Sequence, residues 1–304
     1  MAELEKLIER VKIFMFFRKH RTIIFTDLGS FYTLYFPLIA LNSNYKIQKI
    51  YISSSSRETF AELKSLSVLQ WAKKLLILLK RRKISEFVSY SYICLCSHKF
   101  HEFRRSEFVS DRVDYVSSLG FLRKIPLEQI EVAKFTSNIH WSLLPKYAGM
   151  HPVYWTIRNS ESEFGYTIHE LEEELDRGYI LFQKSFPIED AFTANDVNSI
   201  LRVESRKSFS SFLKNPQKFI DAAYPQNDKQ FKAIMKKPSK KDFLITESDT
   251  KKEILLKFRS GTFDTKIIIE GVEKNVIGIG SLIIKNNPLS YIIELNGLEI
   301  LVEE

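Results

Sequence analysis

Cysteine is scarce in this chain of 304 residues, and long apolar runs are absent. The 2 cysteines, Cys94 and Cys96, are too close together in sequence to form a disulfide framework. The apolar runs are far shorter than the roughly 20 residues that a membrane-spanning helix needs. The N-terminus opens with acidic residues and lacks a signal-peptide profile. We therefore expect a cytoplasmic globular protein without a membrane span.

Glycine is also missing where a dinucleotide-binding site would need it. The first strand-to-helix turn, TDLGSFY, supplies only Gly29, whereas the dinucleotide fingerprint requires three glycines close to the pyrophosphate. An NAD-type site is therefore excluded. The backbone N–H groups of Gly29 and Ser30 could still bind an anion at a helix N-terminus, or the segment could be a plain connecting turn.

The segment CLCSHKFH gathers Cys94, Cys96, His98 and His101, all of which are possible zinc ligands. Four ligands within eight residues would be cramped, because structural zinc sites usually draw ligand pairs from separate segments. The two cysteines are expected to alternate onto one face of a strand as small buried side chains. No metal site is predicted.

The positive charge belongs to the first part of the chain. Residues 239–304 hold 9 basic and 11 acidic residues, which leaves 36 basic and 26 acidic residues in 1–238. This balance favours an anionic ligand there, although solvated surface lysines would also explain it. The run KKLLILLKRRK, 73–83, is consistent with a half-buried helix ending in solvated charge, or with a patch that faces phosphate or a membrane.

Strand-like and helix-like segments alternate from residue 21 onward, which predicts an α/β fold with a mostly parallel sheet. An amphipathic helix is expected at 2–19, as a packed surface helix or one that lies on a membrane. Strands are predicted at 21–27, 45–54, 87–96, 112–120, 132–140, 165–171 and 178–188. Helices are predicted at 31–42, 57–83 and 195–223.

The last part of the chain has a different pattern. Residues 227–242 are polar, basic and contain a proline, as expected of a linker. Short β-branched runs follow at 254–258, 265–271, 276–284 and 291–304. We therefore predict two domains, a larger one over 1–236 that includes the helix at 2–19, and a small β domain over 237–304.

Asn138 and His140 stand two positions apart on a predicted strand, so their side chains point to the same face. They lie at its carboxyl end, where open α/β sheets form ligand crevices. With Asp176 they would suit acyl transfer to an amine, because an amide N–H can bind an oxyanion and an imidazole can move protons near neutral pH. A capped strand end with a hydrogen-bonded histidine and a salt-bridged aspartate is the alternative, and spacing alone favours it.

The stretch NIHWSLLPKYAG, followed by GYTIHELEEELDRGYIL, resembles the formyltransferases that use 10-formyltetrahydrofolate. The hallmark of that family is N-x-H-x-S-L-L-P, an aromatic residue and an Arg-Gly pair, then a G-V-T-x-H strand and a D-T-G turn. The resemblance covers roughly 111–190 well and implies a Rossmann-like formyltransferase domain. It places Asn138, His140 and Asp176 at catalytic positions.

The resemblance also implies binding residues. The backbone of Leu119, Gly120, Phe121 and Leu122 would read the pterin ring of N10-formyltetrahydrofolate, the cosubstrate. On the acceptor side it suggests Lys146, Tyr147, Met150, Arg177 and Tyr224, the last stacking on a nucleotide base. Two residues depart from the family pattern: Ala148 replaces an arginine and Arg177 replaces a threonine.

The segment LLPKYAGMHPVYW is more similar to nucleotide-sugar N-formyltransferases than to the tRNA enzymes. The resemblance implies formyl transfer to a dTDP- or UDP-linked amino sugar for a surface polysaccharide such as lipopolysaccharide O-antigen. A slightly acidic last domain argues against nucleic acid as partner, because tRNA affinity depends on neutralised phosphates. A methionyl-tRNA formyltransferase and a non-catalytic folate- or nucleotide-binding relative remain alternatives. Edge strands of the last domain could form a homodimer.

Overall fold

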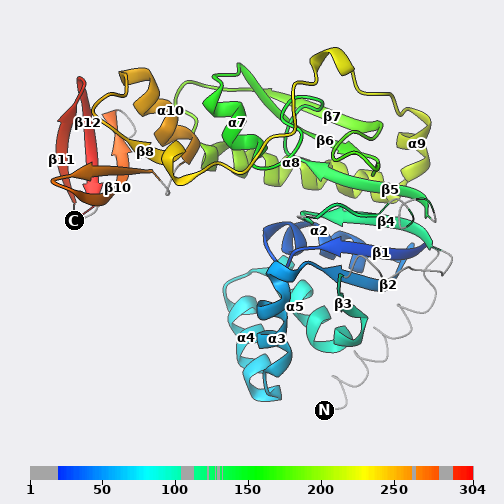
Figure 1. The fold of residues 1–304 in the computed structure, drawn as a ribbon. Helices are drawn as coiled ribbons and strands as arrows, with labels where there is room; N and C mark the ends of the chain where they lie inside the picture. Colours follow the sequence, from blue (N-terminus) through cyan, green and yellow to red (C-terminus); the bar gives the residue numbers. More distant parts are fainter. Residues whose placement is uncertain are drawn as a thin grey trace. The chain divides into compact units, whose positions relative to one another are not determined.

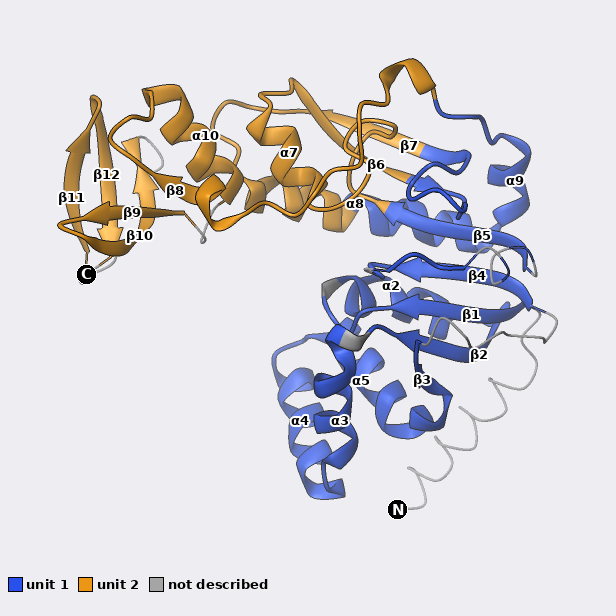
Figure 2. Ribbon diagram, viewed as in Figure 1, with its two compact units in different colours: residues 1–139, 168–182, 204–226 blue, residues 140–167, 183–203, 227–304 orange. Residues whose placement is uncertain are grey.

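The computed structural model describes residues 20–103, 113–121, 123–126, 128, 131, 133–261, 265–280 and 290–303 (Figure 1). The helix expected at 2–19 lies outside the described residues. The chain divides into two compact units (Figure 2). Unit 1 comprises 1–139, 168–182 and 204–226, and unit 2 comprises 140–167, 183–203 and 227–304.

The larger sheet has seven strands in the order β3-β2-β1-β4-β5-β6-β7. Its strands are β1 (His20–Thr26), β2 (Tyr45–Ile52), β3 (Phe100–Glu102), β4 (Val113–Leu119), β5 (Ala133–His140), β6 (Glu163–His169) and β7 (Ile180–Pro187). The described helices of the first 226 residues are α2 (Ser30–Ala40), α3 (Arg57–Ser65), α4 (Val68–Lys80), α5 (Ile84–Cys96), α7 (Pro152–Arg158), α8 (Ala194–Lys214) and α9 (Pro216–Asp221). This arrangement confirms the predicted Rossmann-like α/β fold class.

Parallel pairing dominates unit 1, where β1 pairs with both β2 and β4, and β4 pairs with β5. All seven residues of β4 are buried, as expected of a central strand covered on both faces. The strand order reverses beside β1, so the gap between β1 and β4 is the switch point at which such sheets bind ligands. There the Thr26 hydroxyl donates to the Leu119 carbonyl oxygen at 2.9 Å.

The amino end of β4 carries a buried carboxylate with basic partners. Asp114 accepts a hydrogen bond from the Arg21 backbone N–H at 2.9 Å and forms an ion pair with the Lys134 ammonium at 2.9 Å. Burial acts to raise the pKa of Asp114, but the hydrogen bonds from Arg21 and Lys134 outweigh it and lower that pKa to about 2. This carboxylate ties β4 to both of its neighbours.

Two of the predicted elements of unit 1 are wrong in detail. The helix expected over 57–83 is broken at Leu66, where the backbone is extended, and Ser67 caps a second helix with Gln70. The strand expected at 87–96 is helix α5, with Tyr92 and Cys96 buried at helical spacing. β-Branched and aromatic residues raised the strand propensity there, but burial against neighbouring helices decides the conformation.

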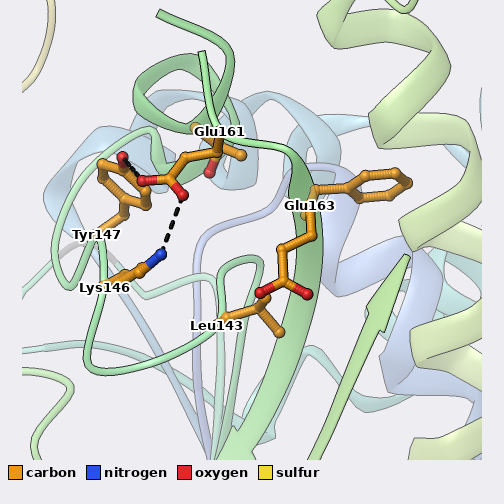
Figure 3. A pocket seen from close by; sticks show the side chains of 7 residues that line it. Leu143, Lys146, Tyr147, Glu161 and Glu163 are labelled. Atoms are coloured by element: carbon orange, nitrogen blue, oxygen red, sulfur yellow. Dashed lines mark hydrogen bonds and ion pairs between the residues drawn. The ribbon is translucent and has the colours of Figure 1, made fainter. Parts of the chain in front are cut away.

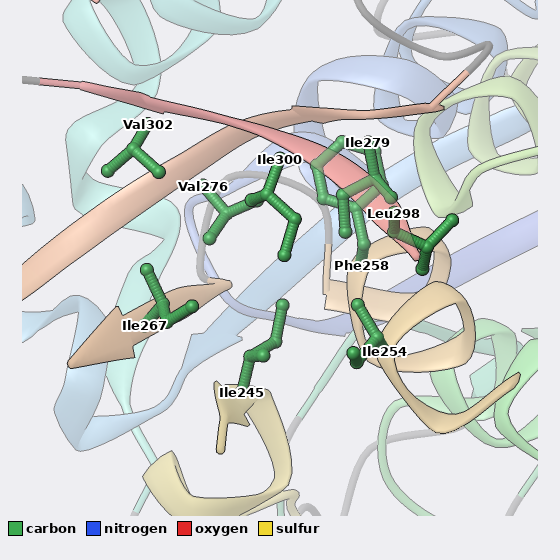
Figure 4. Packing of buried hydrophobic residues seen from close by; sticks show 9 residues of the cluster. All are labelled: Ile245, Ile254, Phe258, Ile267, Val276, Ile279, Leu298, Ile300 and Val302. Carbon is green, nitrogen blue, oxygen red and sulfur yellow. The ribbon is translucent and has the colours of Figure 1, made fainter. Parts of the chain in front are cut away.

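The C-terminal region has its own five-stranded sheet in the order β11-β12-β10-β9-β8, which confirms the small C-terminal β region. Its elements are β8 (Leu244–Ile245), α10 (Lys251–Gly261), β9 (Lys266–Ile269), β10 (Val272–Ile279), β11 (Ser290–Leu295) and β12 (Leu298–Glu303). Figure 4 shows its core, in which Ile254 and Phe258 lie among strand side chains such as Ile300. The domain boundary after residue 236 stays a prediction.

The strand predicted at 254–258 is instead part of α10, and this prediction was wrong. The N–H of Glu253 donates a hydrogen bond to the Thr250 hydroxyl oxygen, and the Glu253 carboxylate accepts one from the Thr250 N–H. This reciprocal pair is a helix-starting capping box. Among the described residues, none of the helices has both the length and the apolar character needed to cross a membrane.

Candidate active site

Three polar side chains meet within unit 1 at the carboxyl end of the sheet. The Asn138 amide nitrogen donates to Asp176 Oδ1 at 3.3 Å and lies 3.2 Å from His169 Nε2. Asp176 Oδ1 and His169 Nε2 are 3.5 Å apart. Asn138 is half-buried, whereas His169 and Asp176 are buried, so this cluster is largely shielded from water.

The tautomer of His169 follows from its hydrogen bonds. Its Nδ1–H donates to the Glu170 carbonyl oxygen at 2.7 Å, which leaves Nε2 as an acceptor for the Asn138 amide. The two amide hydrogens of Asn138 are thereby directed at His169 and Asp176. These hydrogen bonds hold the Asn138 amide donor in a fixed orientation next to the Asp176 carboxylate.

The turn that carries Asp176 is held on several sides. Asp176 has a positive φ of 56°, which is uncommon outside glycine. The Gln226 amide donates to the carbonyl oxygens of Asp176 at 2.8 Å and Gly178 at 2.9 Å. A Cβ at Gly178 would lie 2.1 Å from the Glu170 carbonyl oxygen, so only glycine fits there. Gln226 and Gly178 therefore fix the backbone that presents the carboxylate.

His140 is the last residue of β5 and belongs to unit 2. It is 7% exposed, and its Nε2–H donates to the Tyr147 carbonyl oxygen at 2.8 Å. The segment after it is pinned to β6, because the Thr167 hydroxyl donates to Ser142 O at 2.7 Å and accepts from the Leu144 N–H at 3.1 Å. The ring of His140 is thus held by the folded SLLP segment.

Figure 3 shows the small pocket of unit 2 beside this segment, where Tyr147 and Lys146 both contact Glu161. The Tyr147 hydroxyl donates to Glu161 at 2.6 Å, and the Lys146 ammonium is 3.0 Å from the same carboxylate. Burial and the bond to Glu161 raise the pKa of Tyr147 to about 12. Burial acts to raise the pKa of Glu161, but its bonds to Tyr147 and Lys146 lower it overall. The pocket has room for about one water molecule. Tyr147, Lys146 and Glu161 therefore meet their hydrogen-bonding needs mainly with one another.

The expected pterin-binding residues follow β4. Leu119 is fully buried, and Phe121 packs against Phe103 with ring centroids 5.3 Å apart. Gly120 has a φ of 67°, and a Cβ there would lie 2.8 Å from the Cβ of Phe31. Because Leu119 is buried and Gly120 has no side chain, these two residues can meet a ligand only through backbone groups, whereas Phe121 is partly exposed. Leu122 lies outside the described residues.

The two departures from the family pattern lie in different surroundings. Ala148 is fully buried, and its carbonyl oxygen accepts from the Met235 N–H at 2.6 Å. Met150 is 37% exposed and its N–H donates to Met235 O at 2.9 Å. Arg177 is largely buried, with its Nε 3.8 Å from Glu174. A longer side chain at 148 would have to leave this packed position.

The remaining predicted residues are placed as follows. Tyr224 is 47% exposed, and its backbone pairs with Ile180 through two hydrogen bonds of 2.8 and 3.2 Å. The Gly29 N–H donates to Asp27 O at 2.7 Å and the Leu28 N–H to the Ser56 hydroxyl at 2.7 Å, which favours the connecting turn over an anion site.

The candidate zinc ligands lie on a helix rather than a strand. Cys94 is exposed and Cys96 is buried at the end of α5, so the expected alternation on one strand face was wrong. Within the described part of the chain, the structure brings together no group of three or more potential metal ligands.

Sequence reasoning missed two residues of the cluster. His169 is the histidine of the quoted GYTIH segment, and its position on the strand beside β5 could have signalled a role. Gln226 gives no local signal, because it contacts the Asp176 turn from 50 residues away.

A parallel α/β sheet with a polar cluster at the carboxyl ends of its strands is the architecture of an enzyme that binds small ligands. Residues 94–213 match the family model described as formyl transferase. Over these residues the chain is therefore similar to the formyl transferase family.

Individual relatives agree with this assignment. The methionyl-tRNA formyltransferase of Lactobacillus gasseri is 32% identical over 127 residues, 40% of this chain and 40% of the relative. The GDP-perosamine N-formyltransferase of Brucella melitensis is 40% identical over 82 residues, 27% of this chain and 32% of the relative. The matches to the first curated relatives span less than half of their length.

Solved structures share the fold over most of the chain. An N-formyltransferase from Helicobacter canadensis, crystallised with folinic acid and dTDP-3-aminofucose, has a TM-score of 0.59 at 18% identity. The match covers 92% of this chain and 98% of that one. At this identity the likeness shows the fold alone.

Proposed function

We propose that this protein is an N-formyltransferase that moves a formyl group from N10-formyltetrahydrofolate to the amine of a nucleotide-linked amino sugar. The observation that carries the proposal is the shielded contact of Asn138, His169 and Asp176 inside a formyl transferase domain. His140 is two residues beyond Asn138 on the same strand, and strand alternation directs both side chains to one face.

N10-formyltetrahydrofolate supplies the formyl carbon when it is bound. In the proposed scheme, Asn138 and His140 donate hydrogen bonds to the oxygen that gains negative charge as the amine attacks, and the His140 Nε2–H leaves the Tyr147 carbonyl oxygen to do so. The Asp176 carboxylate accepts a proton from the attacking amine and passes it to N10, as the bond between the formyl carbon and N10 breaks and tetrahydrofolate leaves. The Asn138 amide gives up its longer hydrogen bond, the 3.3 Å bond to Asp176, and donates to this oxygen instead. Its hydrogen bond to His169 keeps the amide oriented.

The described residues fit a folate ligand at the end of β4. The segment turns through the left-handed Gly120 directly after the buried Leu119, which suits backbone recognition of a flat ring. The glycine permits this left-handed turn beside Phe31, and its backbone groups are proposed to meet the pterin.

A nucleotide sugar is the acceptor that the charge distribution favours. Residues 239–304 are slightly acidic, whereas 1–238 hold the basic excess, which suits a compact diphosphate better than a tRNA held by the last domain. The half-exposed Tyr224 offers a ring for a base, and Lys146, Tyr147, Met150 and Arg177 remain proposed acceptor residues. The Brucella and Helicobacter relatives act on or bind nucleotide-linked sugars by their names.

Formylation of methionyl-tRNA is the second candidate, because the Lactobacillus gasseri relative bears that name. It requires the same chemistry at Asn138, His140 and Asp176 with a different acceptor. A binding protein without catalysis is the third, motivated by Ala148 and Arg177.

The test is an acceptor panel with purified full-length protein. Release of tetrahydrofolate is followed with dTDP-, UDP- and GDP-linked 3- and 4-amino sugars and with methionyl-tRNA. We expect turnover on a nucleotide sugar and a loss of at least about a hundredfold in Asp176→Asn and His140→Asn. The control is Asp190→Asn, which changes an exposed carboxylate outside the cluster.

The outcomes separate the candidates. Turnover on methionyl-tRNA alone would identify the tRNA as the acceptor and would leave the proposed roles of Asn138, His140 and Asp176 unchanged. Folate binding by calorimetry without turnover on any acceptor would favour the non-catalytic relative. Full activity in Asp176→Asn would refute the role of the carboxylate.

A further inference from the structure

Helix α4 presents an apolar stripe to solvent on the side opposite its packed face. Trp71 and Leu78 are buried, and α4 packs against α5. On the other side Leu69 is 66%, Leu76 52% and Leu79 48% exposed. With the exposed Ala72, these positions follow one another at intervals of three or four residues, so they lie along one face.

The same helix is strongly basic. Between residues 66 and 83 the chain has six basic and no acidic residues. Lys73 and Lys80 flank the apolar stripe and are exposed, and the exposed Arg81, Arg82 and Lys83 follow at its C-terminal end. Lys83 is within 3.0 Å of Glu86 on α5. We call the face formed by Leu69, Ala72, Leu76 and Leu79 with these cations the α4 face.

We propose that the α4 face docks onto a membrane surface rich in anionic phospholipid. An apolar stripe flanked by lysine and arginine is the pattern of helices that lie in the headgroup region of a bilayer. The leucines would insert below the phosphates while the long cationic side chains reach them. Residues 66–83 contribute no carboxylate of their own, which suits contact with a negatively charged surface.

A second copy of the chain fits the charges less well. A two-fold contact through the α4 face would place one row of cations against another and repel. The α4 face also shares no residue with the proposed catalytic, folate-binding or acceptor-binding set. The inference therefore does not depend on the proposed function.

The experiment is co-sedimentation of the full-length protein with vesicles. Vesicles of phosphatidylcholine alone are compared with vesicles containing about one third phosphatidylglycerol. We expect binding only to the anionic vesicles, and weaker binding at high salt. Removing two charges in Lys73→Gln/Lys80→Gln should weaken binding about twenty-fivefold, since each cation near the surface contributes about fivefold.

Apolar insertion is tested separately with Leu76→Ser, which should weaken vesicle binding about tenfold. The matched control is Leu41→Ser, because Leu41 is 59% exposed but follows α2 and is not part of the α4 face. Formyl transfer in solution should be unchanged in both variants.

Three results would overturn the proposal. The first is equal binding to neutral and anionic vesicles, or to neither. The second is a dimer, seen by light scattering, that Leu76→Ser dissociates, which would assign the α4 face to a second copy. The third is a lower melting temperature of Leu76→Ser without any vesicle binding, which would mean that another part of the chain covers the stripe.

Discussion

Gln226→Met tests whether the turn that carries Asp176 is held in place from a distant segment. Methionine keeps the length of the side chain but removes both donors, so the carbonyl oxygens of Asp176 and Gly178 lose bonds of 2.8 and 2.9 Å. At about 1 kcal/mol for each bond, the turn loses roughly 2 kcal/mol of preference for its present conformation. This free energy corresponds to about a thirtyfold lower kcat if only that conformation is active.

The assay compares kcat and KM of formyl transfer for the wild type, Gln226→Met and a control. Gln217→Met is the control, because Gln217 is an exposed glutamine whose amide donates to Asp221 on its own helix. A positioning role predicts a fall in kcat with a much smaller change in KM, together with a melting temperature lower by a few degrees. If the melting temperature falls while kcat stays at the wild-type value, Gln226 supports the fold alone and our reasoning fails.

Three further substitutions follow from single contacts. Gly178→Ala should abolish most activity, because the added carbon meets the Glu170 carbonyl oxygen at 2.1 Å; near wild-type turnover would show that the turn can move freely. The pKa of Asp114 lies near 2 when folded, below its unfolded value, so its contribution to stability is present above about pH 4 and lost as pH falls toward 2. Urea unfolding should show that Asp114→Asn removes roughly 1–2 kcal/mol at pH 7 and flattens the acid dependence, and parallel curves for both proteins would contradict this. Tyr147→Phe should lower unfolding free energy by about 1 kcal/mol through the lost bond to Glu161, measured by the same method, and no loss would mean that the bond is weak in solution.

The sheet could be predicted from the sequence because its strands are short β-branched runs between turn residues. All seven residues of β4 are buried, although Asp114, Ser117 and Ser118 among them are polar. Elements outside the sheet were harder to predict. Helix α5 has a strand-like composition, and only its packing against α2 and α4, which a single sequence does not display, makes the helix the better solution. At α10 the capping box of Thr250 and Glu253 was available but was outweighed by a contiguous apolar run.

The residues of the candidate site also fall into those that the sequence could predict and those that it could not. Asn138 and Asp176, expected to converge, do contact each other, and alternation along a strand was enough to orient Asn138. His169 and Gln226 entered only with the three-dimensional structure, since their roles depend on which segments meet at the strand ends. Catalytic roles for these residues stay predictions until the variants are assayed.

The order in which unit 1 is assembled has a consequence for its synthesis. Its segments are separated along the chain, and the last one ends at residue 226. While a ribosome is still making residues 183–203, the first 139 residues and the turn at 176 lack the segment with Gln226 that closes them. The nascent protein must therefore wait, with apolar surface uncovered, until that segment leaves the exit tunnel, and chaperone dependence should be greatest in this interval.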